Sequence, residues 1–199
     1  MKQSKTRMIT GCALLIAVSV ILQYIEISIP IMPSFIKLDF SDLPELIGSF
    51  MYGPIAGILI CGIKNLLHVF VSQSGFVGEL SNFILGSVFV GVAGMLYQRN
   101  KTKKNALISG VVGAISMALI SLPVNYFVIY PMYYSILGFP EVAILSMYQL
   151  LLPSISNMVE ALIIFNIPFT LIKGILNVGI CMLVYKRLSI VLKGSLTNK

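Results

Sequence analysis

The stretch that decides the fold is 105-NALISGVVGAISMALISLPVNYFVIYPMYYSILGFP-140, which runs for 36 residues without a charged side chain. A membrane-spanning helix needs about 20 mostly apolar residues. Similar uncharged runs cover residues 8–25, 46–63 and 80–98. The 199-residue chain is 57% hydrophobic and only 11% charged, and its mean hydropathy is +0.95. Because a soluble domain is about 25% charged, these values exclude a soluble globular domain, a disordered tail and a nucleic-acid binder. They predict an all-α, polytopic membrane protein that forms one integral membrane domain.

Basic residues indicate how the chain is oriented. Eleven of the fourteen cations lie in three clusters, namely Lys2, Lys5 and Arg7; Arg99, Lys101, Lys103 and Lys104; and Lys186, Arg187, Lys193 and Lys199. The positive-inside rule places all three clusters, and therefore the N- and C-termini, in the cytoplasm. Two ends on the same side require an even number of crossings.

This parity resolves two ambiguous segments. Residues 43–71 must cross twice, and Gly53-Pro54 is the expected break because Gly ends helices and Pro begins them. Residues 142–159 are also uncharged, and we predict that they form an interfacial or re-entrant segment on the outer side. Six transmembrane helices result, at about 8–28, 42–52, 54–72, 78–98, 105–132 and 166–186.

Polar side chains in the last expected span form a stripe. Asn166, Thr170, Lys173 and Asn177 are spaced by 4, 3 and 4 residues, which places them on one face of a helix. Ionisable groups at membrane depth are costly and usually functional. A ligand or ion site is one interpretation. The other is hydrogen bonding between helices, with Lys173 reaching toward the interface.

The third and fourth spans carry a second set of polar groups. Lys64, Asn65 and His68 lie in the third span, and Glu79 with Asn82 opens the fourth. Lys64 needs an internal partner, and Glu79 is the acid nearest to it in the sequence, so a structural pair is as plausible as a ligand role. Glu79 and Asn82 could equally serve to cap their helix.

The outer half of the expected bundle therefore gathers polar and aromatic groups. Asn125 and Tyr126 lie in the outer third of the fifth span, where Asn125 either binds a ligand or links helices. The first outer loop adds Lys37, Asp39 and Asp42, together with Phe35, Leu38 and Phe40. These groups predict an outward-open cavity suited to a small planar heterocycle, because binding pockets are mostly apolar with a few placed polar groups.

Ala13 and Ala17 form a small-xxx-small face on the first span. Such a face lets two helices approach closely, either within the protein or with a partner. Several motifs are absent from the sequence. It has no Walker A motif, no Ser-His-Asp order, no metal-ligand spacing and no clear internal repeat. We therefore expect neither an enzyme nor a resident cofactor, and a chain that cannot use ATP by itself.

Six short motifs resemble a known family. They are Lys37-Leu-Asp-Phe-Ser-Asp-Leu-Pro44, Tyr52-Gly-Pro-Ile-Ala-Gly57, Lys64-Asn-Leu-Leu-His68, Gly78-Glu-Leu-Ser-Asn-Phe83, Asn125-Tyr-Phe127 and Pro168-Phe-Thr-Leu-Ile-Lys-Gly174. In this order they are similar to the riboflavin-specific substrate-binding subunit, or S component, of energy-coupling-factor (ECF) transporters. The likeness covers about residues 8–188.

The resemblance implies a six-helix prokaryotic plasma-membrane protein that binds riboflavin from outside. It also implies docking, through Ala13 and Ala17, onto one transmembrane T protein and two ATPase subunits, and a loop at 30–41 that covers the ligand. Riboflavin is then a transported ligand and not a cofactor. The substrate contacts expected from the polar pattern and the resemblance together are Leu38, Asp39, Phe40, Asn65, Glu79, Asn82, Asn125, Tyr126, Thr170 and Lys173.

Some alternatives stay open. The chain departs from the family pattern at Thr170, where family members commonly carry Asn, and the Thr side chain reaches less far. The outer side has few cations and no Arg, whose fork suits phosphate, and this favours riboflavin over flavin mononucleotide. An S component for flavin mononucleotide or another small vitamin-like molecule is the alternative function. An intramembrane enzyme or small channel would need catalytic groups or an inner polar path that the sequence lacks.

Overall fold

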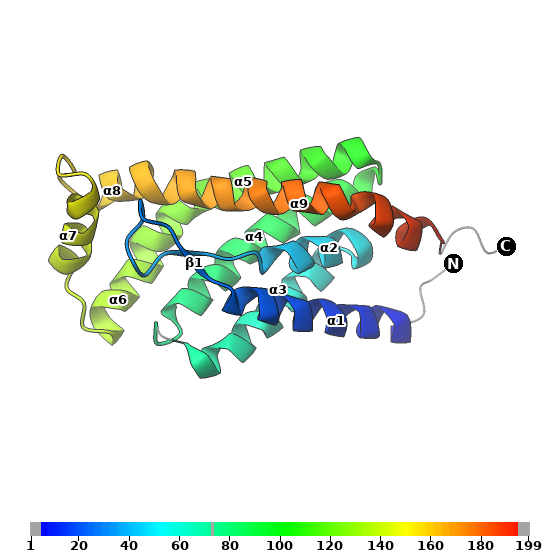
Figure 1. Ribbon diagram of the computed structural model, residues 1–199, viewed down its shortest axis with the longest axis horizontal. Helices are drawn as coiled ribbons and strands as arrows, with labels where there is room; N and C mark the ends of the chain where they lie inside the picture. Colours follow the sequence, from blue (N-terminus) through cyan, green and yellow to red (C-terminus); the bar gives the residue numbers. More distant parts are fainter. Residues whose placement is uncertain (1–4, 73, 195–199) are drawn as a thin grey trace.

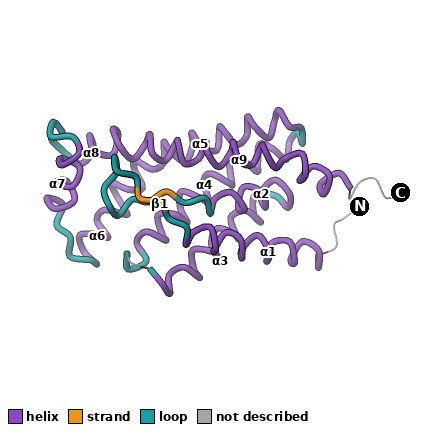
Figure 2. The backbone as a smooth tube through the Cα atoms, viewed as in Figure 1, coloured by secondary structure: helices purple, strands orange, loops and turns teal. Residues whose placement is uncertain are grey.

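The computed structural model describes residues 5–72 and 74–194, the last ten of them as backbone only. Lys2 and Lys199 of the basic clusters lie outside the described residues. The described chain is an elongated helical bundle with one two-stranded hairpin (Figures 1 and 2). The helices are α1 (Lys5–Tyr24), α2 (Asp42–Tyr52), α3 (Pro54–His68), α4 (Val77–Arg99), α5 (Lys103–Val124), α6 (Tyr130–Ile136), α7 (Glu141–Leu151), α8 (Met158–Ala161) and α9 (Ile167–Gly194).

Short irregular helices link several of these elements. A 3-10 turn, η1 (Val69–Val71), extends α3, and two π-helical segments, η2 (Asn125–Ile129) and η3 (Leu162–Asn166), join α5 to α6 and α8 to α9. The hairpin pairs β1 (Ile27–Ser28) with β2 (Lys37–Leu38) in antiparallel register. Within the described residues, five continuous helical stretches are long and apolar enough to cross a membrane. They are Lys5–Tyr24, Pro54–Val71, Val77–Arg99, Lys103–Ile136 and Met158–Val184.

Two helix boundaries differ from the sequence-based expectation. The first helix ends at Tyr24 and not near residue 28, because the chain turns into β1. The last helical stretch begins at Met158 and not at 166, since the Asn157 side chain caps it by accepting a hydrogen bond from the backbone N–H of Glu160. The segment expected to be interfacial or re-entrant is therefore shorter, and it consists of α7 and the turn that follows it.

The second helix is short, as the Gly53-Pro54 break predicts. Helix α2 has eleven residues, so it is roughly 16 Å long at 1.5 Å per residue. Gly53 has a φ of 102°, a conformation open to glycine, and Pro54 begins α3. Leu46 and Phe50 of α2 are buried, and they share one hydrophobic core with residues of α4, α5 and α9. Helix α2 therefore fills only one half of the bundle's length (Figure 1).

The described members of the three basic clusters lie at one end of the bundle. The start of α1, the connection from α4 to α5 and the end of α9 all meet at the right-hand end in Figure 1, and α7 lies at the opposite end. This arrangement agrees with the parity argument from charge. A six-crossing topology with cytoplasmic termini needs α2 to count as a short crossing, and it remains a proposal.

Small residues let the long helices approach closely. A Cβ added to Gly113 of α5 would lie 2.6 Å from the backbone oxygen of Phe89 in α4. A Cβ on Gly174 of α9 would lie 2.7 Å from the Cβ of Ala114. Because both contacts are below van der Waals distance, α5 can sit between α4 and α9 only while these positions remain glycine.

Candidate ligand-binding site

A cavity of about 590 Å³ lies between the two packed cores of the bundle. Its lining combines polar groups with aromatic and aliphatic groups. The polar and charged lining residues are Gln23, Glu26, Ser34, Lys37, Asp39, Asp42, His68, Ser74, Glu79, Ser81, Asn82, Asn125, Asn166, Thr170 and Lys173. The larger apolar and aromatic ones are Tyr24, Phe35, Ile36, Val71, Leu85, Met117, Ile129, Tyr130, Tyr133 and Phe169. Binding pockets for small molecules have about this size and this mixed lining.

The cavity follows from the shortness of α2. Before α2 begins at Asp42, the chain from β1 to Ser41 runs as a hairpin and loop alongside the other helices (Figure 2). A full-length helix here would fill the space. Instead, residues 34–37 and Asp39 of this loop line the cavity, and the Ser19 hydroxyl of α1 donates a hydrogen bond to the backbone oxygen of Ser41.

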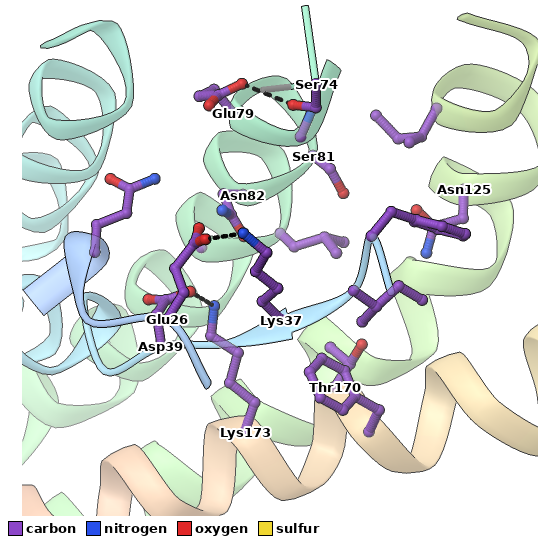
Figure 3. Close-up of a pocket in the computed structure, with 18 of the residues that line it drawn as sticks. Glu26, Lys37, Asp39, Ser74, Glu79, Ser81, Asn82, Asn125, Thr170 and Lys173 are labelled. Atoms are coloured by element: carbon purple, nitrogen blue, oxygen red, sulfur yellow. Dashed lines mark hydrogen bonds and ion pairs between the residues drawn. The ribbon is translucent and has the colours of Figure 1, made fainter. Parts of the chain in front are cut away.

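Five buried charges cluster at the floor of the cavity, and three of them, Asp39, Asp42 and Lys173, line it. The Lys173 ammonium of α9 lies 2.9 Å from Asp39 Oδ2 and 3.4 Å from Asp42 Oδ2 (Figure 3). Lys64 of α3 lies 2.7 Å from Glu45 Oε1 and 3.9 Å from Asp42 Oδ1. All five side chains are at least nine-tenths buried. Charges buried this deeply are tolerated only when they are paired, so the cluster joins α2, α3 and α9 to the loop.

The expected pairing of Lys64 with Glu79 is wrong. Lys64 pairs with acids of α2 and donates a hydrogen bond to Ser41 Oγ at 2.8 Å. Glu79 instead accepts from His68, with 2.8 Å between His68 Nδ1 and Glu79 Oε1. The reason is that α2 packs against α3. Its acids therefore lie closer to Lys64 in space than Glu79 does, although they are farther away in the sequence.

Asp39 is held as a carboxylate by its neighbours. It lies in the loop before α2, outside the helices, and its Oδ1 accepts hydrogen bonds from the backbone N–H and the hydroxyl of Ser41. Burial by itself would raise the pKa of Asp39, but the ammonium groups of Lys173 and Lys64 outweigh it and lower the pKa well below its usual range. The group is therefore charged at neutral pH.

Glu79 forms a second anchored acid on the cavity wall. Its Oε2 accepts hydrogen bonds from the hydroxyls of Ser72, at 2.7 Å, and Ser74, at 3.2 Å, while its Oε1 faces His68. These donors come from the turn between α3 and α4 (Figure 3). A carboxylate fixed in this way can accept a hydrogen bond from a ligand N–H or O–H without reorganising.

Two asparagines reach the cavity from π-helical turns. Asn125 opens η2 just after Pro123, and Asn166 closes η3 just before Pro168. Single π-helical turns within α-helices often mark functional sites. Asn166 also belongs to a closed hydrogen-bonded ring with Tyr130 and Tyr148, whose Oη atoms lie 2.5 Å apart. This ring ties α6 and α7 to η3 at the far end of the cavity.

The structure brings six of the ten expected substrate residues to the cavity. They are Asp39, Glu79, Asn82, Asn125, Thr170 and Lys173. The other four, Leu38, Phe40, Asn65 and Tyr126, are not in its lining. Asn65 donates to the backbone oxygen of Cys61 at 2.9 Å, and Tyr126 is 42% exposed on the outside of the bundle.

Several lining residues escaped the sequence analysis. Tyr130 and Tyr133 are the clearest, and Phe35 packs against both of them and against Tyr148. Tyr130 lies five residues after Asn125, and its backbone N–H bonds to the backbone oxygen of Asn125. An α-helical period of 3.6 residues does not place these two residues on one face, and only the π-helical turn does.

The residues expected to dock a partner lie on the outside of the bundle. Ala13 and Ala17 are both exposed on α1. The nearby Gly11 instead faces inward, where an added Cβ would collide with the Tyr52 side chain. Both alanines therefore lie on the surface of the described chain and not in its core.

The fold and the cavity define a class of protein, namely a helical membrane protein with a polar and aromatic cavity in one half of its bundle. The model of the ECF transporter, substrate-specific component family matches residues 7–185. The chain belongs to this family, whose members are the substrate-specific components of transporters and not enzymes.

Named relatives agree with this assignment. The chain is 33% identical over 193 residues to "Riboflavin transporter RibU" of Staphylococcus aureus (strain TCH60), covering 97% of this chain and 95% of the relative. It is 29% identical to "Riboflavin transporter FmnP" of Bacillus subtilis (strain 168), covering 92% and 93%. A solved structure, described as "Structure and mechanism of the S component of a bacterial ECF transporter", superimposes with a TM-score of 0.75 at 30% identity, covering 96% of this chain and 99% of that one.

Proposed function

We propose that this chain binds riboflavin from the extracellular side and delivers it across the membrane together with an ATP-driven partner module. The cavity carries the proposal, because its groups match the chemistry of the ligand. An isoalloxazine is flat and offers carbonyl and ring-nitrogen acceptors plus one N–H. Asn125 can pair with a donor–acceptor edge, Lys173 can donate to a carbonyl or ribityl oxygen, and aromatic rings can stack on the ring system. The names of the relatives support the same ligand.

The side of entry is inferred from the position of the cavity. The basic clusters mark one end of the bundle, which the positive-inside rule assigns to the cytoplasm. The floor of the cavity is at the start of α2, and its remaining walls extend toward the opposite end, where α6 and α7 lie. A ligand would therefore enter from the extracellular side of the plasma membrane.

Transport needs partners that this chain does not contain. The sequence has no nucleotide-binding motif, and binding by itself shifts a conformational equilibrium only by the differential affinity for the two states. We propose that one transmembrane T protein and two ATPase subunits supply the energy. The exposed face around Ala13 and Ala17 is the proposed contact with the T protein.

A binding measurement tests the ligand. The purified chain in detergent is titrated with riboflavin, and quenching of flavin fluorescence reports the bound fraction. We expect saturable binding at one site per chain and a yellow protein when it is purified from cells that contain riboflavin. Absence of any flavin binding by a monodisperse sample would refute the proposed function.

A transport measurement tests the mechanism. Liposomes holding the chain alone should bind riboflavin without accumulating it, and liposomes that also hold the T protein, both ATPases and internal ATP should accumulate it. A variant ATPase that cannot hydrolyse ATP is the control. Concentrative uptake by the chain alone would contradict the need for an energising module.

A further inference from the structure

Every ammonium group in the cavity lining faces a carboxylate. Within the described residues, the lining contains two lysines, Lys37 and Lys173. Lys37 of β2 forms an ion pair with Glu26 at the base of the hairpin, and Lys173 is paired with Asp39 and Asp42 on the cavity floor (Figure 3). Each of these two lysines is therefore already neutralised by at least one carboxylate, and neither offers an anion an uncompensated positive charge.

Carboxylates also outnumber ammonium groups around the cavity. Four acids line it, namely Glu26, Asp39, Asp42 and Glu79, against the two lysines. His68 Nδ1 is already hydrogen-bonded to Glu79. Behind the floor, Lys64 is paired with Glu45, and this pair adds no net charge. The described walls of the cavity are therefore net negative at neutral pH.

We propose that Asp39 and Glu26 determine the charge specificity of the site, so that it accepts an uncharged flavin and rejects a phosphorylated one. The inference rests on the proposed function. A phosphate ester carries about −1.5 to −2 charges at pH 7 and needs Lys or Arg donors when it is bound. Here the positive charge of each candidate donor in the described lining is already neutralised by an acid, so a phosphate would lie near carboxylates without an uncompensated cation.

The two acids act at different depths. Asp39 is buried and holds Lys173 on the floor, and Glu26 is about one-third exposed and holds Lys37 beside the hairpin. A phosphate that approaches either lysine therefore meets the carboxylate paired with it. With all groups ionised, the floor cluster has three acids and two lysines. Replacing Asp39 by Asn would make this cluster neutral and partly release Lys173.

The experiment compares riboflavin with flavin mononucleotide on the same protein. Both flavins are titrated onto the purified wild-type chain and onto Asp39→Asn, Asp42→Asn and Glu26→Gln variants, and the ratio of the two Kd values is recorded. Wild type should bind riboflavin at least about 10-fold more tightly than flavin mononucleotide. The ratio is the Kd for flavin mononucleotide divided by the Kd for riboflavin. A lysine released by the substitution can bond to the phosphate, so this ratio should fall roughly 10- to 100-fold in the variant whose acid lies nearest to the bound phosphate.

A control variant and the riboflavin affinity of the wild type separate a failure of this inference from a failure of the proposed function. Glu141→Gln removes one acid at an exposed position outside the cavity lining, and it should leave the ratio unchanged. Equal affinity of wild type for both flavins, or a ratio unchanged in Glu26→Gln and in the folded floor variants, would overturn the inference and leave the proposed function intact. Failure of wild type to bind riboflavin would overturn both. Since Glu26 lies in a half-exposed pair, its variant should fold even where a floor variant does not.

Discussion

The ammonium group of Lys173 in α9 lies 2.9 Å from the Asp39 carboxylate, a residue 134 positions earlier in the chain. This contact closes the floor of the cavity and attaches the loop before α2 to the last helix. Because both groups also line the cavity, one interaction serves folding and ligand binding together. Any change at Lys173 therefore has to be measured for stability as well as for affinity.

Replacing Lys173 with Met should destabilise the protein strongly. It leaves Asp39 buried without its ion-pair partner and Asp42 with only Lys64, 3.9 Å away. Breaking a buried pair in this way costs about 3–5 kcal/mol. Adding Asp39→Asn to Lys173→Met removes one uncompensated charge and should restore part of the stability. Thermal unfolding in detergent of the four proteins in this double-mutant cycle measures the coupling. Strictly additive effects would show that the two groups do not interact in the membrane protein.

Asn125→Ala should weaken riboflavin binding while leaving the fold intact. The side chain lines the cavity from a π-helical turn, and a lost neutral hydrogen bond is worth about 0.5–1.5 kcal/mol, or roughly 2- to 12-fold in Kd. Tyr126→Phe is the matched control, because the next residue points away from the cavity. A fluorescence titration compares the two. Equal loss in both variants would place the binding site elsewhere.

Gly113→Ala should lower the free energy of unfolding by about 1–3 kcal/mol, because its new methyl group would be forced against the α4 backbone at Phe89. Gly179→Ala in α9 is a control of the same chemistry, since an added Cβ there meets no atom within 4 Å. That variant should be neutral or slightly more stable, as Ala favours helix. Thermal unfolding distinguishes the pair, and equal melting temperatures would argue against the close α4–α5 contact.

Bulky residues at Ala13 and Ala17 should block transport and spare binding. Both positions are exposed on α1, so Trp at each is accommodated by the isolated chain but prevents close approach of a partner helix. Leu119→Trp adds bulk on the exposed face of α5 as a control. ATP-dependent uptake in liposomes and riboflavin titration in detergent are measured on all three proteins. Normal uptake by the double variant would rule out this docking face.

The six-crossing topology is tested by cysteine labelling. In a background where Cys12, Cys61 and Cys181 are replaced, Thr102→Cys in the α4–α5 connection should react with an impermeant thiol reagent only after the cells are opened. Phe139→Cys, at the exposed turn before α7, should react in intact cells. Labelling of position 102 in intact cells would reverse the orientation or change the number of crossings.

The sequence by itself determined the class of protein and much of its layout. Uncharged runs long enough to cross the bilayer predicted the long helices. Gly53-Pro54 predicted the break after α2, which has eleven residues. The stripe of Asn166, Thr170 and Lys173 reaches the cavity as one helix face, because a local period of 3.6 residues is fixed by backbone hydrogen bonds. These features depend only on residues that are close together in the chain.

Only the tertiary structure decided which groups meet across the bundle. Lys64 pairs with Glu45 and not with Glu79, and Lys173 pairs with Asp39. Periodicity shows which residues share a face, but it does not show how each helix is rotated or which neighbour it faces. The π-helical turn that aligns Tyr130 with Asn125 breaks the period itself. Partners distant in sequence are chosen by packing and by the cost of leaving a buried charge unpaired, and both are properties of the folded chain.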